Sequence, residues 1–335
     1  MKTYYPLIMI LLSFCLSCGY HTIEPEPPNE WRFVWQGNIS SVQSINQIEI
    51  WDQYIFAIEG NNRIAVYDIT LPHSPTFVTD IRLPITGRIN RIALDWRGNI
   101  YVATGSSGLF VLYFRGNSIV FNPGYSHINA IDLSLEDDTL AVLTPRGWSI
   151  YSLIGGFDIN EIMTFNYLTV FHPQRILFYG NWLYIFQGNR TMEVWDVNSS
   201  FNPTQPVWSY TLNGNIIDFC LINDYLSIAV SNGRDHFIYL FDIQMPQFMS
   251  APIITHTSLL PSSINSSKNS IFISFVNNTI IWVYDFNDKF PRYRQYGNFS
   301  SQIKDIEISN DYVFIASLNR IDVYFFNPVP INISL

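Results

Sequence analysis

The sequence predicts an all-β protein: a seven-bladed β-propeller of four-stranded blades, closed by an N-terminal strand that completes the last blade. From Trp31 onward, short β-branched and aromatic runs alternate with turn residues, and no window has an apolar stripe at helical spacing. One kind of run recurs seven times at a mean interval of about 43 residues, which is typical of a propeller blade. The stretch RFVWQGNISS near the start is nearly repeated as RYRQYGNFSS near the end.

The recurring run is the third strand expected in each blade. Its copies are RIAVYDI, LFVLYF, WSIYSL, MEVWDV, FIYLFDI, IWVYDF and RIDVYFF. We call the strands of a blade A to D, and in the first unit they are expected at NQIEIW, QYIFAIE, RIAVYDI and TFVTDIRL. The second strands are apolar at both odd and even positions, as expected for a sheet that packs against neighbours on both faces.

The third-strand pattern resembles that of the LVIVD-repeat propellers. NRIAVYDITLPHSPTFV has the strand, the Asp and the Pro-bracketed turn of that family, and GNIYVATGSSGLFVL has its Tyr-Val-Ala strand before Gly-Leu. The resemblance covers residues 42–335 and is strongest in the first, second and fourth units. WD repeats share the aromatic-Asp pair, but their Gly-His pair is absent here. The LVIVD resemblance implies a propeller of secreted or envelope proteins, most of them without an assigned function.

The two ends of the chain are predicted to meet in one sheet. After the last third strand only NPVPINISL remains, which is short and broken by two prolines. The N-terminal WRFVWQGN precedes the first A strand just as RYRQYGNF precedes the last one. It is therefore expected to supply the missing D strand of the seventh blade, which pairs backbone groups that would otherwise be exposed.

Residues 1–18 have the layout of a secretory signal peptide, with one basic residue and then an apolar run too short to span a bilayer. They end in Cys15-Leu16-Ser17-Cys18, which resembles a bacterial lipobox although Cys15 stands where Leu is usual. The resemblance implies a lipid anchor on Cys18, and the Gly that follows favours the outer membrane, on either side. The alternative is secretion after cleavage near Cys18. Residues 19–30, rich in Pro and Glu, are expected to be a tether, and residues 31–335 the propeller.

Composition narrows the possible partners. The formal net charge is -9 and only four residues are lysine, which argues against binding to a phosphate backbone, so no nucleic acid partner is expected. Cys220 is the only cysteine after the signal, which leaves a monomer without a disulfide or a Cys-based zinc site. We expect a monomeric propeller with no cofactor and no metal, attached to the membrane only through its lipid.

Charged residues divide between the two faces of the expected ring. The DA and BC loops lie on one face and the AB and CD turns on the other, where most acidic residues fall. Arginine occurs in five of the seven BC loops and is predicted to form a ring at the channel mouth that could bind carboxylate or phosphate. Alternatively, each arginine only ties down its own loop. The five are Arg63, Arg146, Arg190, Arg234 and Arg320.

No catalytic constellation is recognised. Four histidines occur one to a blade without metal-ligand spacing: His127, His172, His236 and His256. Three aromatic residues of the DA loops are candidates for stacking on a sugar: Tyr125, Tyr167 and Phe171. We expect a non-enzymatic binding or scaffolding module that holds a protein or glycan through its DA/BC face. The alternatives are a propeller enzyme, such as a polysaccharide lyase or hydrolase acting at the channel mouth, and a simple spacer.

Overall fold

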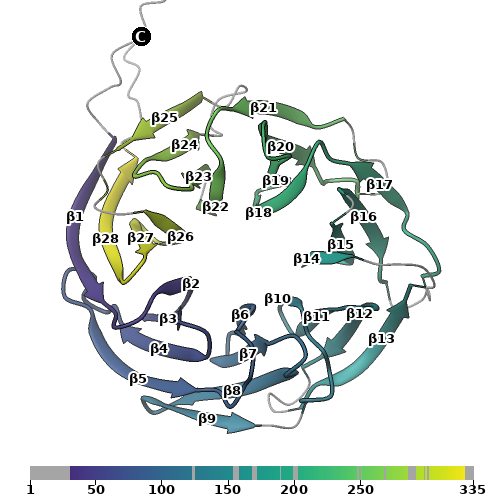
Figure 1. Ribbon diagram of the computed structural model, residues 1–335, viewed down its shortest axis with the longest axis horizontal. Helices are drawn as coiled ribbons and strands as arrows, with labels where there is room; N and C mark the ends of the chain where they lie inside the picture. The colour runs from purple at the N-terminus through teal and green to yellow at the C-terminus, as the bar shows by residue number, and fades with distance from the viewer. Residues whose placement is uncertain are drawn as a thin grey trace, which may run out of the picture.

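Seven antiparallel sheets of four strands form a ring around a central channel in the computed structural model (Figure 1). The structure describes residues 31–122, 125–153, 158–167, 172–188, 190–198, 203–246, 249, 251–267, 269–285, 292–297, 299 and 302–328. All elements assigned to these residues are strands, and no helix in this part of the chain is long and apolar enough to cross a bilayer. The all-β, seven-bladed prediction is confirmed.

Each blade runs from an A strand at the channel to a D strand at the rim. Blade 1 comprises β2 (Ile45–Trp51), β3 (Tyr54–Glu59), β4 (Arg63–Asp68) and β5 (Thr76–Arg82). Blade 2 comprises β6 (Arg91–Leu94), β7 (Asn99–Ala103), β8 (Leu109–Arg115) and β9 (Ser118–Asn122). Blade 3 comprises β10 (Asp132–Glu136), β11 (Thr139–Thr144), β12 (Gly147–Ser152) and β13 (Asn160–Asn166).

The remaining blades follow in chain order. Blade 4 comprises β14 (Pro173–Tyr179), β15 (Trp182–Gln187), β16 (Thr191–Asp196) and β17 (Trp208–Thr211). Blade 5 comprises β18 (Asn215–Ile222), β19 (Tyr225–Ser231), β20 (His236–Asp242) and β21 (Ile253–Thr257). Blade 6 comprises β22 (Pro261–Ser267), β23 (Ser270–Phe275), β24 (Ile281–Asp285) and β25 (Arg292–Tyr296). Blade 7 comprises β26 (Ile303–Ser309), β27 (Tyr312–Ser317), β28 (Arg320–Pro328) and β1 (Trp31–Ser40).

The N-terminal strand closes the ring as predicted. In Figure 1, purple β1 lies beside yellow β28, and the two pair antiparallel from Trp31 opposite Pro328 to Ser40 opposite Arg320. The register shifts between Trp35 and Gly37. A side chain at Gly37 would place its Cβ 2.7 Å from the carbonyl oxygen of His73, so only glycine lets the CD turn of blade 1 lie against this strand. Close packing therefore accounts for one of the glycines in the duplicated stretch.

The hydrophobic core lies between neighbouring blades. Each sheet buries both faces; all six residues of β23, for example, are buried. The N-terminal strand contributes to this core through Phe33, whose ring centroid lies 4.8 Å from that of Tyr296, 5.5 Å from Phe299 and 5.0 Å from Phe326. Aromatic pairs at these distances stabilise a fold beyond the burial of their area. We call the pairing of β1 with β28 the clasp. It is held by backbone hydrogen bonds and by an aromatic cluster between blades 6 and 7.

Candidate ligand-binding site

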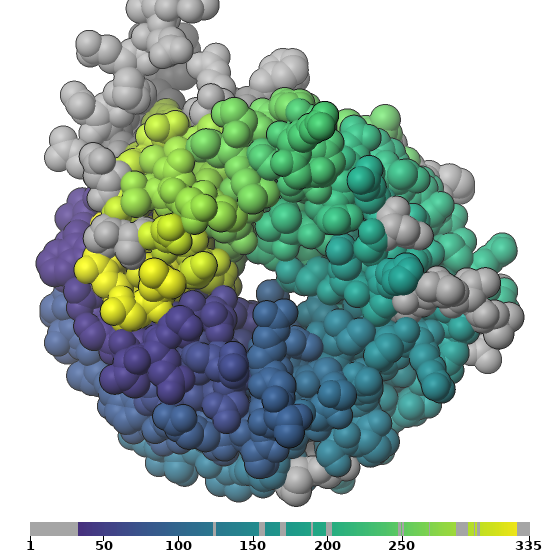
Figure 2. All heavy atoms as spheres, in the orientation of Figure 1, coloured from purple at the N-terminus to yellow at the C-terminus, as the bar shows by residue number. Residues whose placement is uncertain are grey.

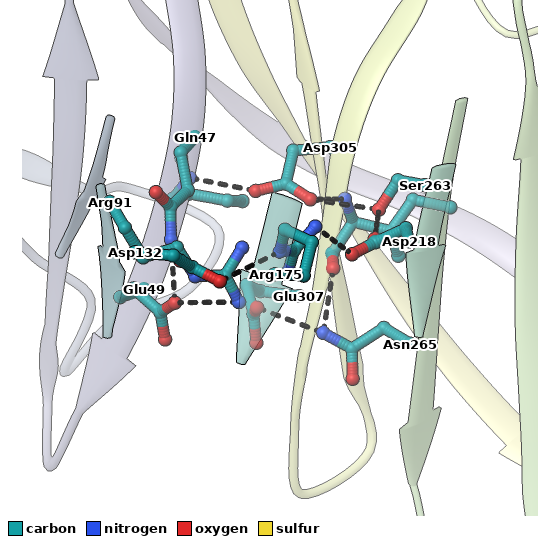
Figure 3. Close-up of polar contacts among 12 residues, drawn as sticks. Gln47, Glu49, Arg91, Asp132, Arg175, Asp218, Ser263, Asn265, Asp305 and Glu307 are labelled. Carbon is teal, nitrogen blue, oxygen red and sulfur yellow. Dashed lines mark hydrogen bonds and ion pairs between the residues drawn. The ribbon is translucent and has the colours of Figure 1, made fainter. Parts of the chain in front are cut away.

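Each A strand carries, at the same position, one residue whose polar side chain projects into the channel (Figure 3). We call these seven residues the inner ring. They follow one another at intervals of 41 to 45 residues along the chain. The inner ring consists of Gln47, Arg91, Asp132, Arg175, Asp218, Ser263 and Asp305.

Three carboxylates of the inner ring each bind the backbone of the next blade. In each case the aspartate accepts the backbone N–H of the residue that directly follows the inner-ring residue of the next blade. The bonds are Ile176 N to Asp132 Oδ2 (2.9 Å), Ile264 N to Asp218 Oδ2 (3.0 Å) and Ile48 N to Asp305 Oδ2 (2.9 Å). These three hydrogen bonds join neighbouring blades at the channel, which the same carboxyl groups line.

Arg175 joins three blades. Its Nε lies 3.1 Å from Asp132 and its Nη1 lies 2.9 Å from Asp218, while the guanidinium lies 4.7 Å from the centre of the Phe219 ring. The hydroxyl of Ser263 continues the network by contacting Asp218 at 3.3 Å and donating to Asp305 at 2.9 Å. A planar, forked group suits this position because it can bind two carboxylates in fixed directions.

The channel is more acidic towards the AB/CD face. Glu49 accepts a hydrogen bond from Gln47 at 2.7 Å and lies 3.9 Å from Arg91, and Glu307 accepts one from Asn265 at 2.8 Å. Removal from bulk water raises the pKa of both glutamates. The side chain of Glu49 nevertheless keeps 24% exposure. Part of this group therefore still meets solvent in the channel.

Asp305 has a shifted pKa for the same reason. Burial raises the pKa of its carboxyl to about 7, and the negative charge of Asp218 adds to the rise. The hydrogen bond from Ile48 acts in the opposite direction because it favours the ionised form. The proton occupancy of this carboxyl therefore changes near neutral pH.

A cavity of about 390 Å³ opens at the DA/BC end of the channel, and Figure 2 shows the channel open at the centre of the ring. The charged residues that line this cavity are four cations, Arg88, Arg91, Arg175 and Lys304, and two acids, Asp218 and Asp305. The amides of Asn46, Asn61 and Asn90 also line it. A second cavity of about 280 Å³ continues towards Glu49 and Glu307 and shares part of the inner ring. We call the first of these the mouth cavity.

The charges of the mouth cavity are not equally compensated. Asp218 and Asp305 each accept several hydrogen bonds, whereas Arg88 and Lys304 are exposed. Within the described residues neither of these two cations forms an ion pair. The mouth cavity therefore presents uncompensated positive charge to the solvent.

The arginines of the BC loops occupy other positions on the same face. Arg63 forms ion pairs with Glu59 and, at 2.8 Å, with Asp80, and Arg320 lies 2.9 Å from Asp322. The other three are exposed: Arg146, Arg190 and Arg234. None of the five lines the mouth cavity.

The histidines do not converge. The buried His236 hydrogen-bonds the hydroxyl of Ser231 at 2.9 Å, and the exposed His256 lies 4.0 Å from Asp235. His127 and His172 are exposed. Across the described ranges no three His, Cys, Asp or Glu side chains are placed to hold a metal ion.

Two of the three aromatic residues proposed for sugar stacking are part of the fold. The Tyr125 hydroxyl accepts the backbone N–H of Ile159 at 3.0 Å, and Tyr167 donates to Glu193. Phe171 lies outside the described residues, as does Cys18.

The sequence patterns did not identify the inner ring as a set. The third-strand repeat was recognised by its recurring aromatic-Asp pair, whereas the inner ring changes residue type from blade to blade. The same period, applied to the A strands, would have aligned its seven positions.

Comparison with known proteins supports the fold alone. No family model matches the sequence, and none of the curated proteins matches it. Raptor from Chaetomium thermophilum aligns over 90% of this chain and 30% of its own, with a TM-score of 0.71 and 14% identity. The Pan2 WD40 domain of Neurospora crassa aligns over 90% and 97%, with a TM-score of 0.67 and 11% identity. The computationally designed Ika8 protein aligns over 88% and 99%, with a TM-score of 0.61 and 12% identity. The LVIVD resemblance therefore rests on the sequence motifs.

Proposed function

We propose that this protein is a binding or scaffolding module that holds a protein or glycan through its DA/BC face. The observation that carries this proposal is the mouth cavity, which combines a polar recess with the uncompensated charges of Arg88 and Lys304. Ligand sites are usually concave and contain a few polar groups that fix the orientation of the ligand.

A lipid anchor on Cys18 would be connected to the face of the propeller opposite the mouth cavity. Trp31, where the propeller begins, pairs with Pro328 at the AB/CD end of blade 7, and Ser40 pairs with Arg320 at the BC end. The chain therefore enters the ring on the face opposite the mouth cavity. A fully extended tether over residues 19–30 would reach at most about 40 Å. We place the module on the bacterial envelope, at the outer membrane, with the mouth cavity open to a ligand.

One observation favours the alternative of an enzyme. Carboxylates with raised pKa values, such as Asp305 and Glu307, converge in the channel, as acid–base catalysis requires. Asp305, however, already accepts hydrogen bonds from Ile48, Ser263 and Ile306. Its oxygens are occupied in joining blades, which supports binding as the function.

Site-specific photocrosslinking in the organism that makes the protein tests this proposal. The photoreactive residue p-benzoylphenylalanine replaces Val42 in the DA loop, which is 85% exposed, or Trp96 in an AB turn, which is 68% exposed. We expect a covalent adduct with a cellular partner from position 42. An adduct formed only from position 96 would contradict the proposal.

A further inference from the structure

Three exposed apolar side chains lie in loops of the DA/BC face, one in the DA loop that leads into blade 1 and two in the BC loops of blades 6 and 7. Val42 is 85% exposed, Leu318 is 50% exposed and Val276 is 42% exposed. Backbone bonds hold the DA loop of Val42 against the BC loop of blade 7: Ser41 N donates to Asn319 O (2.7 Å) and Ile45 N donates to Leu318 O (2.9 Å). These bonds hold the loop of Val42 against the loop of Leu318, and Val42 lies two residues along the chain from Ser44, which lines the cavity.

The unpaired charges of the mouth cavity determine which sign of charge a ligand should carry. Asp218 is compensated by Arg175 and by the N–H of Ile264, and Asp305 by the N–H groups of Ile48 and Ile306. By contrast, Arg88 and Lys304 are exposed at the rim of the cavity, with no ion pair inside the described part of the chain. The complementary group is an anion, which a guanidinium and an ammonium together can hold.

The lining of the cavity distinguishes between a sugar and a polypeptide. Sugar rings are usually bound on aromatic side chains, and none of the described residues that line the mouth cavity is aromatic. The lining is made of amides, hydroxyls, charged groups and isoleucines, and the apolar side chains of Val42 and Leu318 lie outside it. This combination fits a carboxylate side chain with an apolar neighbour, as an acidic peptide presents them.

We infer that the ligand of the DA/BC face is an acidic polypeptide segment. One of its carboxylates enters the mouth cavity towards Arg88 and Lys304, and a neighbouring apolar side chain lies on Val42 and Leu318. This inference rests on the proposed function and narrows it to one class of ligand.

Selection from a library of random heptapeptides displayed on phage tests the inference on the full-length protein in detergent. We expect the selected peptides to be enriched in Asp and Glu. The test variant combines Arg88→Gln with Lys304→Gln, and the matched control combines Arg146→Gln with Arg234→Gln. Each pair removes two exposed positive charges from the same face, so neither is expected to change the melting temperature.

The affinity of a selected peptide, measured by fluorescence anisotropy, separates the two variants. The mouth variant should weaken binding at least about tenfold and the control by less than about twofold. Enrichment of neutral or basic peptides, no enrichment, or equal loss in both variants would overturn the inference. If crosslinking from position 42 still captures a partner, the proposed function survives that failure; crosslinking from position 96 alone removes the proposed function itself.

Discussion

The carboxylate of Asp305 accepts the backbone N–H of Ile48 at 2.9 Å across a sequence separation of 257 residues. This bond joins the last blade to the first at the channel, while the pairing of β1 with β28 joins the two ends of the chain at the rim. Ring closure therefore has an inner and an outer component, and the inner one depends on a carboxyl group that titrates near neutral pH.

Replacing Asp305 tests the inner component through the pH dependence of stability. Its pKa is raised to about 7 in the fold from an ordinary 3.8. The contribution of this carboxyl group to the free energy of unfolding is therefore full below the ordinary pKa and is lost as the pH rises through about 7. The neighbouring Glu49 and Glu307 act in the same direction, since their pKa values are also raised, whereas Arg91 opposes the rise.

We therefore expect Asp305→Asn to reduce the change in melting temperature between about pH 5 and about pH 8, a range that spans the titration of this carboxyl group. Asparagine keeps an oxygen that can accept the N–H of Ile48, so the fold should persist. The control is Asp158→Asn, which changes an exposed acid and should leave the pH dependence as it is in the parent. An unchanged pH profile in Asp305→Asn would show that this carboxyl does not titrate near pH 7.

The outer component depends on Phe33. Phe33→Ala should lower the free energy of unfolding by about 2 kcal/mol or more, because it removes a ring from the cluster with Tyr296, Phe299 and Phe326. Val34→Ala on the same strand is the control, since Val34 is 46% exposed and the substitution should cost less than about 0.5 kcal/mol. Urea unfolding measures both. Equal stability of the two variants would mean that the clasp is held by backbone pairing alone.

Arg175 should be required for stability because it compensates two carboxylates. Arg175→Met leaves Asp132 and Asp218 without their shared cation and is expected to cost about 3 kcal/mol. Arg175→Lys should restore only part of this, because an ammonium cannot fork between the two acids. Denaturant unfolding at neutral pH provides the comparison. If the methionine variant is as stable as the parent, channel water is sufficient to solvate both acids.

Membrane attachment should depend on Cys18. Cys18→Ser is expected to move the protein from the detergent phase to the aqueous phase in a cloud-point separation, because the acyl chains are lost. The control is Cys15→Ser, which should keep the protein in the detergent phase. Incorporation of labelled palmitate into the parent and the control, but not into Cys18→Ser, would support lipidation. Labelling of Cys18→Ser would place the lipid elsewhere.

The fold was predictable because its strongest signal repeats the same residue types. The C strands all place apolar residues between two blades, so RIAVYDI and MEVWDV resemble each other directly. The clasp was predictable because RFVWQGN and RYRQYGN fill equivalent places, and Gly37 shows why glycine is needed in the first of them. Shared packing constraints produced sequence similarity in both cases.

The inner ring was not predictable in the same way. Its residues are complementary to their neighbours in the ring: Arg175 is flanked by Asp132 and Asp218, so equivalent positions carry opposite charges. A search for recurring residue types does not detect such a set. The recurring arginines were detected, but loop type specifies the face of a propeller and not the distance from its axis; Arg63 and Arg320 pair with acids of their own blades.

The most direct test of the binding function is to block one face at a time. A polyethylene glycol maleimide is attached to Val42→Cys on the DA/BC face or to Trp96→Cys on the AB/CD face, with the buried Cys220 kept in both proteins. Binding of the crosslinked partner, once purified, is then measured on each conjugate. Loss of binding with the polymer at position 42 and unchanged binding with the polymer at position 96 is the predicted result. Unchanged binding with the polymer at position 42 would contradict a ligand site on the DA/BC face.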